Sequence, residues 1–320
     1  MSTTIKGIQQ RGFLRAGVSL GINGLSYFDK LKSTWKGFDI DVARAVSVAI
    51  LGDDKAIEWI PLQSGERFHA LHNQLIDIGT FNATLSFSRE VEYGLSFMEP
   101  LLYDGEVFMI RKNLLAQVGK LSNLKKPIVS AIKGSTTHQN LEIYFSNNQI
   151  EYEPIFSNTP DEALAVYEQE KCHLYCLDRI LLAGERLRLQ HPEEHIILPD
   201  VISREAMSPI VSNRDPNWVM AVKWILKSLI EAEVLGLSQD NILEKKNQAK
   251  GYIHQFLNPY PELCKKLGLV SHFTEKVISY IGNYADIYHR NIGELSPLNL
   301  PRGENNLRSN GGLLFSPLFL

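Results

Sequence analysis

The pattern of apolar and polar positions predicts alternating strands and helices in the first eighty residues. Alternation over 12–20 predicts a strand, and apolar residues at helical spacing from Val42 to Ile50 predict a helix that Asp39 caps. Three further elements follow, a strand at 59–62, a helix at 67–74 and a strand at 76–79. This βαβαβ order is typical of a parallel sheet with helices on its faces.

A second series of the same kind begins near Pro127. Strands are predicted at 128–132, 152–156 and 173–177, and helices at 134–145, 161–169 and 181–189. Thr159 followed by Pro160 marks the start of the second of these helices. Extended segments at 106–111 and 207–213 flank the series, which predicts a second lobe inserted into the first through two strands. Such a connection suits hinge closure around a ligand.

The remaining residues predict a helical and then irregular end to the chain. A long amphipathic helix is expected at 218–235, and two more helices at 261–267 and 274–287. From Gly293 onward the content of proline, glycine and asparagine predicts a tail without regular structure that lies on a lobe.

Composition and charge exclude several classes of protein. The 320 residues are 44% hydrophobic and 22% charged, which is globular composition and enough for two lobes. A net charge of −3 gives no basic surface for nucleic acid. The sequence has no apolar stretch near the roughly 20 residues that span a bilayer. Its first six residues lack the apolar core of a signal peptide, which taken alone indicates the cytosol.

Metal and cofactor sites are not expected. The three cysteines, Cys172, Cys176 and Cys264, lack further ligands at zinc spacing, so we expect them to be small buried side chains. The sequence also contains no G-x-S-x-G, H-E-x-x-H or G-x-G-x-x-G motif. These observations favour a binding protein over an enzyme.

Polar residues follow the predicted strands, where parallel sheets bind their ligands. The segment 82–89 ends in Arg89, whose planar guanidinium matches a carboxylate. The alternative is that Ser86 or Ser88 caps a helix and Arg89 is a solvated residue of its first turn. In the second series Ser135 and Thr136 open a helix whose free N–H groups suit an anion, although an ordinary capped helix is the alternative.

Asp178 closes an apolar strand of the second series. A carboxylate there suits an ammonium group, and the alternative is an N-cap for the helix at 181–189. Together the arginine, the helix start and the aspartate offer what a zwitterionic α-amino acid requires, two partners for its carboxylate and one for its amine.

Several segments spread along nearly the whole chain carry a family resemblance. They are Trp35–Asp41, Thr84–Arg89, Gly134–Thr137, Glu194–Pro199, Trp218–Gly236 and Gly282–Tyr288. These segments resemble the periplasmic general L-amino-acid-binding proteins of polar amino-acid ABC importers. The resemblance implies an α/β fold of the two-lobe type II periplasmic-binding-protein kind. Its parts are the first lobe at 1–107 and 211–244, the second at 108–210, and a C-terminal extension at 245–320.

The resemblance also implies roles for single residues. Arg89 and Thr84 match the family's partners for the ligand carboxylate. Asp178 matches the acid that binds the ligand's amine. Asn82 stands at the position whose backbone carbonyl usually accepts a hydrogen bond from that amine. Ser135 and Thr136 match the donors of the second lobe.

The residues expected near the ligand side chain depart from the family pattern. Ser26 and Tyr27 fall in the loop that usually covers the side chain. His138 stands where an acid is usual, and Leu85 where tryptophan is expected. These departures concern side-chain specificity and leave the contacts with the amino-acid head group unchanged.

The function that the resemblance implies is capture of a free L-amino acid between the lobes and delivery to the membrane permease of an ABC importer. The protein is then a periplasmic monomer without cofactor. Ala16, Ala43 and Ser130 stand where relatives carry cysteines, which keeps a cytoplasmic location as the alternative.

Two other functions stay open on the same fold. One is a dehydratase of the cyclohexadienyl or arogenate type, for which Glu66, Glu90 and His138 are the candidate acids. The other is a cytosolic amino-acid sensor.

Overall fold

The computed structural model describes residues 2–320, which form two compact units. The first unit comprises the described residues up to Leu62, then Glu66–Leu102 and Met207–Leu320. The second comprises Gln63–Gly65 and Tyr103–Ala206. The chain leaves the first unit within one strand, β7 (Leu102–Asp104), and returns within another, β13 (Glu205–Ser212). The predicted insertion of one α/β lobe into another is therefore confirmed.

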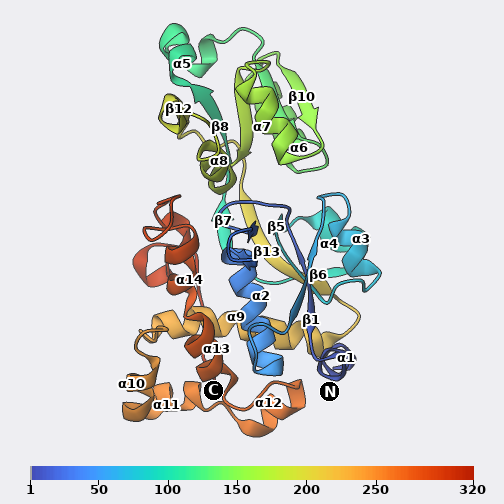
Figure 1. The fold of residues 1–320 in the computed structure, drawn as a ribbon, viewed down its shortest axis with the longest axis vertical. Helices are drawn as coiled ribbons and strands as arrows, with labels where there is room; N and C mark the ends of the chain where they lie inside the picture. The colour runs from blue at the N-terminus through green and yellow to red at the C-terminus, as the bar shows by residue number, and fades with distance from the viewer. Residues whose placement is uncertain (1) are drawn as a thin grey trace. The chain divides into compact units, whose positions relative to one another are not determined.

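The first unit is built on a six-stranded sheet in the order β4-β1-β5-β13-β6, with β7 paired to β13. Its other strands are β1 (Leu14–Val18), β4 (Ile57–Pro61), β5 (Ile78–Thr84) and β6 (Leu95–Phe97). β1 is parallel to both β4 and β5, whereas β13 is antiparallel to β5 and β6. The carboxyl ends of β1 and β5 therefore lie side by side (Figure 1).

Helices and a small hairpin complete the first unit. The helices are α1 (Thr3–Arg11), α2 (Phe38–Leu51), α3 (Arg67–His72), α4 (Phe87–Tyr93), α9 (Pro216–Val234), α10 (Ile242–Gln248), α11 (Gly251–Leu257), α12 (Pro261–Leu267), α13 (Phe273–Ile281) and α14 (Tyr284–Asn291). The hairpin pairs β2 (Tyr27–Asp29) with β3 (Thr34–Lys36). In the part of the chain that the structure describes, none of the helices has the length and apolar character needed to cross a bilayer.

The second unit contains a five-stranded sheet in the order β10-β9-β11-β8-β12. Its strands are β8 (Glu106–Arg111), β9 (Ile128–Ile132), β10 (Glu153–Ser157), β11 (Leu174–Asp178) and β12 (His195–Ile197), and its helices are α5 (Lys112–Val118), α6 (Thr137–Asn147), α7 (Pro160–Glu168) and α8 (Arg179–Arg186). β9 is parallel to β10 and β11, and β8 runs antiparallel to β11. The segment 106–111, expected as a crossing strand, thus belongs to this sheet.

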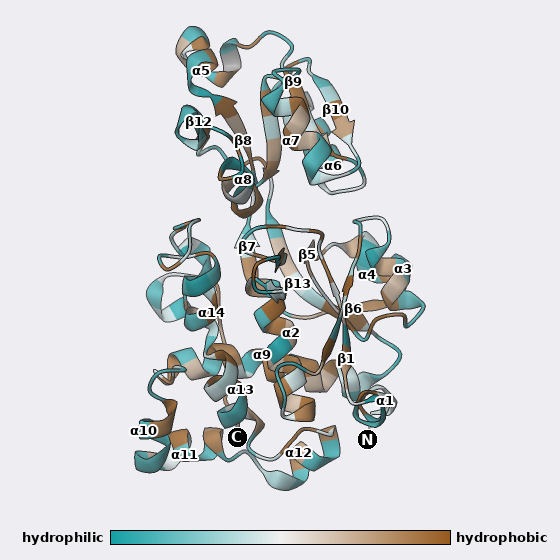
Figure 2. Cartoon of the chain, viewed as in Figure 1, coloured by the Kyte–Doolittle hydropathy of each residue, from teal (hydrophilic) through white to brown (hydrophobic). Residues whose placement is uncertain are grey.

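Each unit has its own apolar core. Phe81, Leu95 and Ile210 belong to a buried cluster in the first unit, and Phe108 and Phe145 belong to one in the second. Figure 2 shows the apolar character of β1 and β8, which is expected for strands that are covered on both faces.

Some predicted helix boundaries were wrong. Asp39 does not cap α2, because the helix begins at Phe38 after Gly37, and Asp39 is a buried residue of its first turn. The helix expected at 274–287 is two helices, since Gly282 adopts a left-handed φ of 92° and Asn283 starts a new helix with a capping box. The start of α7 at Pro160, with Thr159 as its cap, confirms that prediction.

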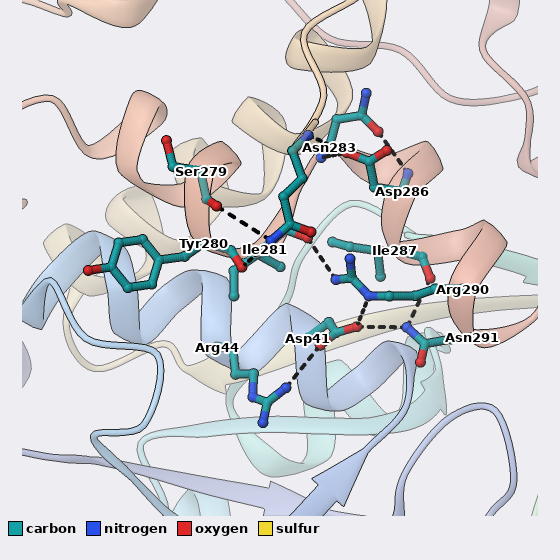
Figure 3. Close-up of polar contacts among 11 residues, drawn as sticks. Asp41, Arg44, Ser279, Tyr280, Ile281, Asn283, Asp286, Ile287, Arg290 and Asn291 are labelled. Atoms are coloured by element: carbon teal, nitrogen blue, oxygen red, sulfur yellow. Dashed lines mark hydrogen bonds and ion pairs between the residues drawn. The ribbon is translucent and has the colours of Figure 1, made fainter. Parts of the chain in front are cut away.

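The C-terminal extension is fixed to the first unit by polar contacts. Arg290 donates to the Asp41 carboxylate at 2.8 Å and to the Ile281 carbonyl at 2.7 Å, and Asn291 donates to the same Asp41 oxygen at 2.7 Å (Figure 3). Asp41 is buried, so these donors replace its lost hydration. Beyond Asn291 the regular elements are short 3₁₀ turns, and Lys227 donates to the Phe315 carbonyl. The tail therefore lies on the first lobe, as predicted.

We expect Arg290→Ala to lower the free energy of unfolding by about 1–3 kcal/mol, because it leaves a buried carboxylate with fewer donors. Urea denaturation of the ligand-free protein measures the change. Lys246→Ala is the control, since it removes an exposed ion pair with Glu275 and should cost less than about 1 kcal/mol. Equal effects of the two substitutions would contradict an anchoring role for Arg290.

Candidate functional site

The carboxyl ends of β1 and β5 form the polar edge of the first unit. Asn82 lies in β5 with a left-handed φ of 47°, which asparagine tolerates better than most residues. Its side-chain oxygen accepts a hydrogen bond from the Ser19 hydroxyl at 2.7 Å. The side chain of Asn82 is thus fixed to the end of β1.

Arg89 and Thr84 lie together at this edge. Ser86 caps α4 by accepting the backbone N–H of Arg89, as the capping alternative required. The guanidinium nevertheless folds back, donates to the Thr84 carbonyl at 2.9 Å, and lies 5.2 Å from the centre of the Phe68 ring. These contacts position the guanidinium, whose planar fork matches the geometry of a carboxylate.

The loop that carries Ser26 and Tyr27 packs closely against the start of α2. Ser26 is fully buried and its hydroxyl donates to the Ser19 carbonyl at 3.2 Å, whereas Tyr27 is partly exposed. Gly37 has a φ of 131°, and a Cβ there would lie 2.1 Å from the Leu25 carbonyl oxygen. Only glycine fits at this point. We therefore expect Ser26 to act through the shape of the loop and Tyr27 to be the residue that meets a ligand.

Arg67 is a residue of this edge that the sequence interpretation missed. Its guanidinium donates to the Ser19 hydroxyl at 2.8 Å and to the Phe81 carbonyl at 2.9 Å. Burial lowers the pKa of Arg67 to about 10, against the opposing effect of Asp39 and with a further lowering by Arg89. Burial also raises the pKa of Asp39 to about 7. Arg67 therefore adds positive charge beside Arg89, at the edge of the first unit that is expected to hold a carboxylate.

The second unit presents its own polar edge, at the ends of the parallel strands β9 and β11. Ser135 donates to the Ile132 carbonyl at 2.7 Å and accepts the N–H of Thr137 at 3.3 Å, so its hydroxyl shapes the turn that opens α6. The hydroxyl of Thr136 lies 3.5 Å from a carboxylate oxygen of Glu205. Both residues therefore lie at the helix start, as predicted.

Asp178 ends β11 without serving as a helix cap. It occupies the N-cap position of α8 but makes no side-chain capping bond, and its buried Oδ1 has no hydrogen-bond partner among the described residues. Burial, followed by the charges of Glu106, Asp104 and Glu205, raises the pKa of Asp178 well above its ordinary value. An unpaired buried acceptor is costly, so the capping alternative does not account for this side chain.

Two glutamates that the sequence interpretation missed surround Asp178. Glu106 lies directly opposite Asp178 in the antiparallel pair of β8 and β11. One carboxylate oxygen from each of Glu106, Asp178 and Glu205 lies within 4.8 Å of the other two. The amide of Asn140 donates to Glu106 at 3.0 Å and to Glu205 at 2.9 Å. We call these three carboxylates the acidic cluster.

His138 lies on α6 with about half of its side chain exposed. Its Nε2 is 3.2 Å from a carboxylate oxygen of Glu142, and its ring lies 4.3 Å from the ring of Phe156. Its predicted part in ligand binding stays a prediction.

Comparisons with known proteins identify the family. The profile of the bacterial extracellular solute-binding proteins, family 3, matches residues 14–244. The chain belongs to this family. A polar edge in each of two α/β units agrees with this membership, because binding proteins hold solutes at strand ends.

Similar members of the family match the chain nearly end to end. The general L-amino acid-binding periplasmic protein AapJ of Rhizobium johnstonii is 37% identical over 99% of this chain and 92% of that protein. The glutamate/glutamine/aspartate/asparagine-binding protein BztA of Rhodobacter capsulatus is 32% identical over 99% and 94%. An ABC transporter periplasmic binding protein from Brucella ovis, with glutathione bound, matches with 35% identity and a TM-score of 0.95 over 99% of both chains.

Proposed function

We propose that the protein captures a free L-amino acid and delivers it to a membrane ABC importer on the outer side of the cytoplasmic membrane. The observation that carries the proposal is the buried Oδ1 of Asp178, which has no hydrogen-bond partner among the described residues. The first unit contributes the positioned guanidinium of Arg89. Opposite charges at two strand-end edges suit the two ends of a zwitterion. The names of the similar proteins support the same solute class.

In this proposal each predicted residue has one task. Arg89 and Thr84 bind the ligand carboxylate on the first lobe, and the helix start with Ser135 and Thr136 adds donors from the second. Asp178 and the backbone carbonyl of Asn82 bind the amine. Closure of the lobes then brings both sets of partners onto one ligand, and the permease recognises the closed form.

The ligand side chain is contacted by residues that do not bind the carboxylate or the amine. Tyr27, with the loop that Ser26 shapes, and His138 are the proposed neighbours of the side chain. Head-group recognition of this kind admits many amino acids. It also admits glutathione, whose γ-glutamyl end carries a free α-amino and α-carboxyl group.

We favour capture over dehydratase chemistry because of where the candidate acids lie. An acid that protonates a leaving group is normally activated by burial. Glu66 is exposed at the N-cap of α3, Glu90 is exposed on α4, and His138 is half exposed. Incubation with prephenate and arogenate tests the alternative, and turnover of either compound would favour the enzyme.

A thermal-shift screen with the twenty common L-amino acids and glutathione tests the proposal. A compound present at 100 times its Kd should stabilise the protein by about 2.7 kcal/mol, because it binds only the folded state. We expect several amino acids to raise the Tm, and D-enantiomers to have smaller effects. No shift with any of these compounds would overturn the proposed function.

A further inference from the structure

The acidic cluster contains three carboxyl groups, although one aspartate is enough to hold an amine. Glu106 and Asp178 face each other as a cross-strand pair, and like charges in that position repel. Glu106 is 1% exposed and Glu205 is 4% exposed, so water does not screen them well. In the ligand-free second unit, ionisation of the cluster is therefore unfavourable because of electrostatic repulsion, and a positively charged partner would remove this repulsion.

Unused acceptor atoms show where that partner belongs. Oε1 of Glu106 and Oδ1 of Asp178 are buried and have no hydrogen-bond partner among the described residues. Asn140 points its amide nitrogen at both glutamates and thereby holds them in place.

The three oxygens lie close enough together for one primary ammonium group to reach all of them. Such a group has three N–H donors in tetrahedral directions. Oxygens about 2.8 Å from the nitrogen in those directions lie about 4.6 Å apart. The three carboxylate oxygens of the cluster lie within 4.8 Å of one another.

We propose that Glu106 and Glu205 act with Asp178 as a three-carboxylate site for the ligand's ammonium group, and that the site releases protons when the ammonium binds. The proposal rests on the proposed function and adds two residues and a proton exchange to it. The carbonyl of Asn82 and one of the carboxylates would share one of the three N–H donors of the ammonium group. The protein should therefore require a free primary amine and bind more tightly as the pH rises.

The charges around the cluster set the direction of this pH dependence. In the second unit the titratable and charged groups at the cluster are Asp104 on β7, Glu106 on β8, Cys176 and Asp178 on β11, Arg179 on α8 and Glu205 on β13, and burial keeps the Cys176 thiol neutral by raising its pKa. Arg179 is the cation among them and acts on Asp104.

Burial, assisted by the charges of Glu205 and Asp104, raises the pKa of Glu106 to about 7, against the hydrogen bonds from Thr137 and Asn140, which lower it. Glu106 is thus partly protonated at neutral pH in the free lobe. A bound ammonium favours the ionised carboxylate and lowers this pKa, so a proton leaves on binding.

Calorimetry on the full chain tests the proposal with wild type, Glu106→Gln, Glu205→Gln and the control Glu153→Gln. Glu153 is exposed in the same unit, so its substitution should change nothing. The probes are the twenty common L-amino acids, and each one that binds is compared with its Nα-methyl and Nα-acetyl derivatives. Titrations in buffers of different ionisation enthalpy count the protons released.

Glu106→Gln should match wild type at about pH 5.5, where Glu106 is protonated, and bind about tenfold more weakly at about pH 8.5. A merely structural role would weaken binding equally at both values. The Nα-methyl derivative should lose about tenfold in affinity, because it has one donor fewer, and the Nα-acetyl derivative should not bind. These derivative and proton-release measurements on wild type need no variant to fold.

The outcomes separate the two proposals. Amino-acid binding without proton release, with the same Kd in Glu106→Gln at high pH, would overturn the three-carboxylate site and leave the proposed function intact. Stabilisation of the ligand-free protein by Ca²⁺ or Mn²⁺ that Glu106→Gln abolishes would also overturn it, in favour of a metal site. Absence of binding by all twenty amino acids would remove the proposed function, and this inference with it.

Discussion

Replacing Arg89 with alanine is expected to weaken amino-acid binding by roughly 30-fold or more, since losing one partner of a desolvated charge pair costs about 2–5 kcal/mol. The guanidinium is held by the Thr84 carbonyl and the Phe68 ring, so the charge has a fixed position before the ligand arrives. Arg89→Lys should keep the charge and lose the fork, giving an intermediate affinity. Isothermal titration calorimetry measures both effects.

The matched control for Arg89 is Arg214→Ala. Arg214 is an exposed arginine of the same unit whose guanidinium lies 3.3 Å from His72, and its loss should leave Kd unchanged. An unchanged Kd in Arg89→Ala would remove Arg89 from the site.

Asp178→Asn should affect binding and stability in opposite directions. Binding should weaken by roughly 30-fold or more, because asparagine keeps the shape of the side chain and loses the charge that meets the amine. The ligand-free protein should become more stable, since burial holds the pKa of Asp178 well above its ordinary value of 3.8. A residue that disfavours folding while it favours binding is expected at a functional site.

The sign of the stability change follows from proton binding. The folded protein holds the Asp178 proton more tightly than the unfolded chain does, so wild-type stability falls as pH rises from 3.8 toward the raised pKa. The gain from Asp178→Asn should therefore grow with pH across that range. Urea denaturation at a series of pH values measures it. Asp161→Asn, at an 80% exposed position of the same unit, is the control, and equal pH curves for the two variants would contradict the prediction.

The alternation of strands and helices was visible in the sequence because each unit buries a sheet between helices. The strand at 128–132 and the helix at 261–267 match the structure residue for residue. The break at Gly282 was missed, since apolar spacing continues across it and only the capping box of Asn283 marks the new helix. The hairpin of β2 and β3 was missed as well, because its strands are short and partly exposed.

The candidate site was only partly predictable, for a different reason. Arg89, Asp178 and the helix start were visible because they follow strands directly. Glu106 begins a strand, and it reaches the same edge because β8 runs antiparallel to β11. Glu205 is brought there by a segment far along the chain, and the amide of Asn140 meets both glutamates from α6. Such contacts depend on strand direction and register, which a local pattern of residues does not specify.

The order of segments along the chain also determines when each unit can fold during synthesis. The second unit is almost wholly one stretch and can close once Ala206 has left the ribosome. The first unit cannot complete its sheet at that stage, because β13 lies between β5 and β6 in the sheet and is synthesised after nearly all of the second unit. The strands before Tyr103 therefore wait with open edges, which are templates for aggregation.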